Sequence, residues 1–172
     1  MHRRARRSAQ PLDVMKVLLV VCVIIAVIGT IVLLARSRVV PTHHVGASDT
    51  TRVLEQMRAS SESPTFAVFM FSTSGRPSDE DDLNIQFSME GGRAGFDWVL
   101  LAPRNIQDEV RFVEFANQRG FSPTRQEMNN VKYWRVEEGD IAKLCAEIIS
   151  DMYDMPASAN IELITEGFEW RP

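Results

Sequence analysis

The most regular pattern of hydrophobic and polar positions lies in residues 83–90, where every second residue is apolar. A period of two is typical of a strand that buries one face and exposes the other. Gly91 and Gly92 follow this segment, and because both can adopt positive φ they predict a two-residue hairpin turn. Residues 93–101 are then the returning strand of the hairpin.

A second hairpin is predicted over residues 124–137, because Asn129 and Asn130 tolerate the left-handed conformation that a tight turn requires. Residues 66–72 are predicted to form a buried strand, and residues 160–165 a closing strand. Together these segments predict a sheet of about six strands.

Three segments have the spacing of helices. Residues 49–59 and 105–119 each place apolar side chains on one face, and a third helix is predicted to begin at Asp140 and to end before Pro156. The third has the clearest amphipathic pattern in the predicted domain. Its apolar positions are Ile141, Leu144, Cys145, Ile148 and Met152.

The order of these elements predicts an α+β fold. From residue 93 onward the order is strand, helix, strand, strand, helix, strand, which is the ferredoxin-like βαββαβ order. An N-terminal strand pair precedes this core. We therefore expect an antiparallel sheet with its helices on one face and a ferredoxin-like core that the strand pair extends.

An apolar run precedes the predicted domain, and residues 17–35 include 19 consecutive uncharged positions. At about 1.5 Å per residue the run spans roughly 28 Å, close to the ~30 Å hydrocarbon core of a bilayer. A cleaved signal peptide is the alternative, but its apolar core is usually ~7–15 residues long. We predict a basic tail (residues 1–16), a single transmembrane helix (17–35), a linker (36–48) and a soluble domain (49–172).

The charges that flank the run predict its orientation. Five Lys and Arg residues precede it, and three follow within a similar distance. The positive-inside bias therefore favours a cytoplasmic N-terminus, with the chain in the inner membrane and the domain outside the cytoplasm. The reversed topology stays open as an alternative.

The net charge of −4 conceals two parts of opposite sign. The first 52 residues hold 8 Lys and Arg against 2 Asp and Glu, whereas residues 53–172 hold 11 against 21. An acidic domain argues against nucleic acid as a partner, because phosphate binding requires basic surface. The expected partners are membrane lipid, through residues 17–35, and another protein.

Few side chains of the predicted domain suit catalysis or metal binding. His2, His43 and His44 all precede it, so it holds no histidine as general base, triad member or zinc ligand. Cys145 falls on the apolar stripe of its helix, where a packed thiol is inert. The acidic residues 78–82 lack the ligand spacing and internal glycine of a calcium loop. We therefore predict no catalytic residue, metal or cofactor.

Four residues are candidates for contacting a partner: Asp97, Tyr133, Trp134 and Trp170. Asp97 is expected to face water on the uncovered sheet face, with Lys132 or Arg135 as its ion-pair partner, and a buried acid is the alternative. The three aromatic residues would form an exposed anchor. For Trp134 a place in the core is favoured over the anchor, and for Trp170 both positions stay open.

The element order over about residues 49–155 (helix, three strands, helix, two strands, helix) resembles the type III secretion chaperone-like domains, which include the YbjN family. The resemblance also includes the hairpin strand at residues 131–136 and the amphipathic helix after it. The closing strand departs from that pattern. The resemblance implies a protein-binding fold without catalytic machinery.

The sequence thus favours a membrane-tethered, non-enzymatic binding or accessory domain that engages another envelope protein or a membrane complex. One alternative is a membrane-anchored hydrolase that uses only carboxylates, which would require two acids in one cleft. The other is a chaperone-like adaptor that faces the cytoplasm, which would require the reversed topology.

Overall fold

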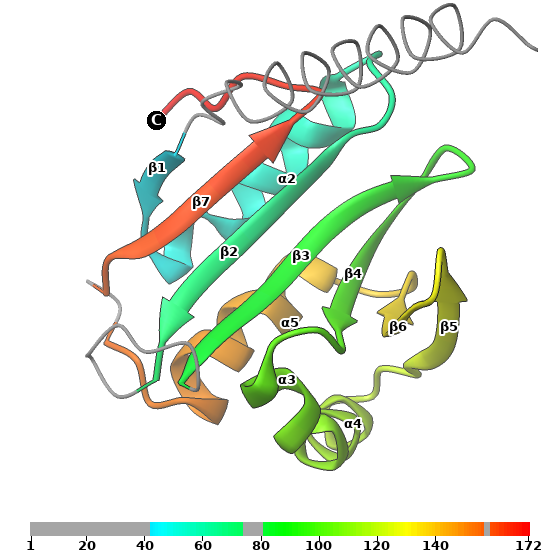
Figure 1. The fold of residues 1–172 in the computed structure, drawn as a ribbon. Coiled ribbons are helices and arrows are strands. Elements are labelled where there is room, and N and C mark those ends of the chain that lie inside the picture. The colour runs from blue at the N-terminus through cyan, green and yellow to red at the C-terminus, as the bar shows by residue number, and fades with distance from the viewer. Residues whose placement is uncertain (1–41, 74–80, 157–158) are drawn as a thin grey trace, which may run out of the picture. The chain divides into compact units, whose positions relative to one another are not determined.

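The computed structural model describes residues 42–73, 81–156 and 159–172, and its framework is one sheet of seven strands (Figure 1). The strands are β1 (Thr42–Val45), β2 (Phe66–Ser72), β3 (Asp82–Glu90), β4 (Arg93–Val99), β5 (Thr124–Met128), β6 (Val131–Val136) and β7 (Ile161–Glu166). Their order across the sheet is β1-β7-β2-β3-β4-β6-β5. Every pair of neighbours runs antiparallel.

The helices are α2 (Thr50–Ala59), α3 (Pro103–Gln107), α4 (Glu109–Gln118) and α5 (Ile141–Glu147). A short 3₁₀ turn, Ala47–Asp49, precedes α2, and a π-helical turn, Ile148–Met152, extends α5. Helices α2 and α5 lie side by side behind the sheet in the view of Figure 1. The five apolar positions predicted for the third helix are all buried, which confirms its amphipathic pattern.

Aromatic side chains on the helix-covered face join the central strands to α4. Phe69 of β2, Phe87 of β3 and Phe96 of β4 are fully buried. Their rings meet edge to face, with centroids 5.4 Å apart for Phe69 and Phe87 and 6.3 Å apart for Phe87 and Phe96. Trp98 stacks on Phe112 of α4 at 4.7 Å. Such ring contacts add to the stabilisation that burial of apolar area gives.

The buried side chain of Asn105 completes the hydrogen bonding of β3 where β4 no longer reaches it. The β3–β4 ladder begins at the pair Ile85 and Trp98, so Asn84 has no partner strand on that side. The Asn105 amide donates to the Asn84 carbonyl and accepts from the Asn84 N–H. Asn105 also fixes the indole of Trp98, because Trp98 Nε1 donates to the backbone carbonyl of Asn105. Buried backbone groups require such partners.

The predicted ferredoxin-like core is wrong. That core would place β7 next to β4, whereas β7 pairs with β2. The hairpin of β2 and β3 separates β7 from β4. With β2 as its neighbour, β7 places Leu163 opposite Phe69, so that both side chains enter the same core.

The predicted transmembrane helix, residues 17–35, lies outside the described residues, as do the basic tail and the acidic segment 78–80. Among the residues that the structure does describe, no helix is long and apolar enough to cross a membrane. The fold class is therefore corrected to an α+β domain built on a seven-stranded antiparallel sheet. The described residues, 42–73, 81–156 and 159–172, belong to one compact unit.

The domain also begins earlier than predicted. Residues 36–48 were expected to be a linker, but Thr42–Val45 forms strand β1 and pairs with β7. His43 and His44 are therefore residues of an edge strand. Four residues without a clear alternating pattern give no sequence signal of a strand, since the partner β7 lies more than a hundred residues away along the chain.

Candidate functional site

Strand β5 is an exposed edge of the sheet. It pairs with β6 on one side, and within residues 42–73, 81–156 and 159–172 no strand pairs with its other side (Figure 1). Four of its five residues are exposed, and Gln126 is half-buried. An open edge offers unpaired backbone N–H and C=O groups to an extended segment of another chain.

The turn that joins β5 to β6 determines which backbone groups of β5 face outward. Asn129 and Asn130 have φ of 52° and 66°, the combination of a type I′ turn. In such a hairpin the residues next to the turn, Met128 and Val131, exchange hydrogen bonds, and hydrogen-bonded pairs then alternate along the ladder. The backbone groups of Arg125 and Glu127 therefore point away from β6.

The opposite edge of β6 supports this assignment. Lys132 lies opposite Glu127, and its carbonyl accepts from the Leu100 N–H on the β4 side. Because the backbone groups of Lys132 point toward β4, those of Glu127 point away from β6 and out of the sheet. Successive pairs alternate, so Arg125 shares this orientation.

Contacts with α4 hold β5 from the helix side. Arg125 lies 3.4 Å from the Glu109 carboxylate, and its guanidinium lies over the Trp134 ring, 5.8 Å from the centroid. Trp134 Nε1 donates to the same carboxylate at 2.8 Å. The first turn of α4 thus positions both the indole and the guanidinium, and Arg125 remains half exposed.

A buried ion pair lies on the sheet face that α2 and α5 leave uncovered. Asp97 of β4 and Arg135 of β6 are directly opposite each other, with side chains 1% and 0% exposed. Arg135 Nη1 donates to Asp97 Oδ1 at 2.7 Å and to Ser88 Oγ at 2.8 Å. Ser88 and Gln86 in turn donate to the second oxygen of Asp97. A buried charge pair requires this degree of hydrogen bonding.

The surroundings of the pair shift the pKa values of Arg135, Glu137 and Tyr133. Burial by itself would lower the pKa of Arg135, but its contacts with Glu137 and Asp97 outweigh that effect and raise the pKa above the ordinary value. The hydrogen bond from Arg135 lowers the pKa of Glu137. Burial, followed by the neighbouring Glu90, raises the pKa of Tyr133. The raised pKa keeps Arg135 charged at ordinary pH.

Gly95 allows the Arg135 side chain to lie across β4. A Cβ at this position would be 2.3 Å from the guanidinium carbon of Arg135. Only glycine leaves that space, so the pair of Asp97 and Arg135 also depends on the absence of a side chain at Gly95.

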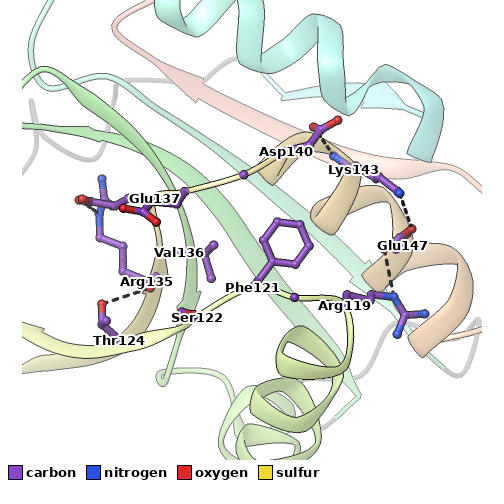
Figure 2. A pocket seen from close by; sticks show the side chains of 13 residues that line it. Arg119, Phe121, Ser122, Thr124, Arg135, Val136, Glu137, Asp140, Lys143 and Glu147 are labelled. Carbon is purple, nitrogen blue, oxygen red and sulfur yellow. Dashed lines mark hydrogen bonds and ion pairs between the residues drawn. The ribbon is translucent and has the colours of Figure 1, made fainter.

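A cavity of about 820 Å³ lies between the segment after α4 and the segment before α5 (Figure 2). The Phe121 ring is part of its lining, and Arg119, Lys143 and Glu147 lie along the α5 side. Arg119 and Lys143 both contact Glu147, at 3.0 Å and 3.7 Å. These charges are paired with one another, so the cavity favours neither sign of ligand charge, and its contacts hold the two connecting segments together.

The thiol and the acids of the domain have structural positions. Cys145 is fully buried, and burial raises its pKa well above the ordinary value, as expected for an inert packed thiol. In the part of the chain that the structure describes, no three His, Cys, Asp or Glu side chains are grouped so that they would hold a metal ion. Asp108 binds Arg104 and the hydroxyl of Tyr153.

The structure separates the four residues that the sequence singled out. Asp97 binds Arg135, as expected, but it is fully buried, so the prediction that it faces water is wrong. Tyr133 and Trp134 are successive residues of β6 and point to opposite faces. Trp170 is 5% exposed and packs beneath Arg52 of α2. The aromatic residues thus form no common surface, and partner binding by any of the four stays a prediction.

Comparisons of the chain with protein-family models, with curated proteins and with solved structures found no match. The resemblance to type III secretion chaperone-like domains therefore stays a prediction that rests on element order.

Proposed function

We propose that this chain is a non-enzymatic binding protein whose domain receives an extended segment of a protein partner along the outer edge of β5. The observation that carries the proposal is the pair of outward-facing backbone positions, Arg125 and Glu127, on an exposed edge strand. Backbone hydrogen bonds would supply affinity, and the alternating side chains of β5 would supply specificity.

The surroundings of β5 support this use of the edge. Met128 is 50% exposed at the end of the strand and offers an apolar side chain to a partner. The contacts of Arg125 and Trp134 with Glu109 hold the strand against α4, so the edge is fixed before a partner arrives. A preorganised edge loses less conformational entropy on binding than a mobile one.

The proposal includes the location of the partner. The uncharged run of residues 17–35 and the basic residues before it favour association with a membrane, which would confine the domain to within a few tens of ångströms of the lipid surface. We infer that the partner is itself an envelope protein or part of a membrane complex in the inner membrane.

Replacing Glu127 with proline tests the proposal. Proline lacks the outward N–H and fills the edge with its ring, so partner capture should fall severalfold, whereas the fold should persist because no bond to β6 is lost. The measurement is chemical cross-linking in cells with the full chain as bait, followed by quantification of the captured proteins.

Glu127→Ala is the matched control, because it removes the same carboxylate and keeps the N–H, so it should lose only the side-chain contribution and capture clearly more partner than Glu127→Pro. Gln126→Pro shows the cost of a lost ladder bond, because the N–H of Gln126 points toward β6. Equal capture by the Glu127→Pro and Glu127→Ala chains, both folded, would contradict binding at this edge.

A further inference from the structure

The charged residues of β5 are arranged so that two copies of the strand can pair with opposite charges facing each other. Arg125 and Glu127 are its only charged residues, and they lie on either side of Gln126. If two copies of β5 pair antiparallel about a twofold axis through Gln126, Arg125 of each copy lies opposite Glu127 of the other. The symmetry produces this contact twice.

We propose that the strand received by β5 is β5 of a second copy of this chain, paired antiparallel with Gln126 on the twofold axis. This inference rests on the proposed function, since it names the occupant of the same edge. The two sheets would then continue into each other across the axis, and each copy would donate and accept the same set of hydrogen bonds.

The backbone pattern fits this register. Arg125 and Glu127 point their N–H and C=O groups outward, so each would exchange two hydrogen bonds with its opposite residue in the second copy. Gln126 would lie opposite Gln126 of the second copy, in a pair without backbone hydrogen bonds between them. This fits, because the N–H of Gln126 points toward β6 and not toward the second copy. An axis through Arg125 or Glu127 would instead place like charges directly opposite each other.

The side chains fit on both faces. On the helix side, Arg125 is already held by Glu109 at the rim of the edge, and its five donors allow it to contact a second carboxylate. On the other face, Met128 would lie opposite Thr124 of the second copy, which would cover an apolar side chain that is now 50% exposed. Opposite-charge cross-strand pairs and covered apolar area both favour such pairing.

A disulfide across the axis tests the register. In the full chain with Cys22→Ser, Gln126→Cys is expected to form disulfide-linked dimers under mild oxidation. Cα atoms of a directly opposed pair without backbone bonds are about 4.5 Å apart, within the range that a disulfide spans. Cys145 is buried and should not react.

Thr124→Cys is the matched control. Thr124 is exposed and lies on the same face of β5 as Gln126. The proposed register separates the two copies of residue 124 by four positions, roughly 13 Å along the strand, which is too far for a disulfide. Dimers that form as readily with Thr124→Cys as with Gln126→Cys would overturn the proposal.

Charge reversals provide the second arm. In the Gln126→Cys chain, either Arg125→Glu or Glu127→Arg places two like-charge pairs across the axis and should lower the dimer yield severalfold. The two reversals together should restore it. Mixing the Arg125→Glu chain with the Glu127→Arg chain should also restore it, as a dimer of the two variants.

The outcomes separate the two proposals. Failure of the double reversal and of the mixture to restore cross-linking overturns the self-pairing. If Gln126→Cys gives no dimer while Glu127→Pro still lowers capture of a different protein severalfold, the second copy is the wrong occupant and the proposed function stands. If neither substitution has an effect, both proposals fail.

Discussion

Replacing Asp97 with alanine is expected to lower the free energy of unfolding by about 3 kcal/mol, because it leaves the Arg135 guanidinium buried without its main partner. Ser88 also loses the carboxylate to which it donates. Arg135 keeps its contact with Glu137 at 2.8 Å, which places the loss at the lower end of the range for a broken buried pair. Urea unfolding of the parent and variant measures the difference.

The control for this prediction replaces both partners. A chain with Asp97→Leu and Arg135→Met buries no unpaired charge at this position, so it should lose much less stability than the sum of the two single variants. A double variant that loses as much as that sum would show that the cost does not come from an uncompensated charge.

Replacing Trp98 with alanine is expected to have the largest effect, a loss of about 4 kcal/mol. The side chain is fully buried, stacks on Phe112 and donates to the Asn105 carbonyl, so the change creates a cavity and also removes a hydrogen bond. Since folded domains are stable by about 5–15 kcal/mol, thermal unfolding should shift to a much lower temperature.

Trp134 is the matched control for Trp98, because it lies directly opposite Trp98 across the β4–β6 ladder but is only half-buried. Trp134→Ala should therefore cost clearly less stability. An equal loss for the two variants would contradict the view that the row from Phe69 to Phe112 forms the centre of the core.

Local patterns in the sequence predicted the individual elements well. Both hairpins could be located from the alternation of residues 83–90 and from the glycine and asparagine pairs. Residues with positive φ fix the geometry of a tight turn, and the turn involves only residues close together in the sequence. The order of strands in the sheet depends instead on contacts between distant segments. No local pattern shows that Leu163 lies opposite Phe69, and the ferredoxin-like prediction failed for that reason.

The same distinction applies to the candidate site. The sequence singled out aromatic residues, but Tyr133 and Trp134 are divided between the two faces of one strand. It did not single out Arg125 and Glu127, because their importance comes from β5 being the last strand of the sheet, which only the strand order shows. The signal that was present is the polar, short character of residues 124–128, which is typical of an edge strand.

Amide hydrogen exchange at β5 tests most directly whether this edge receives a partner strand. Measured residue by residue on the full chain, the amides of Arg125 and Glu127 should exchange rapidly in dilute solution and become protected in the associated state. The Gln126 amide, bonded to β6, should be protected in both. Unchanged, rapid exchange of Arg125 and Glu127 in the associated state would contradict the account.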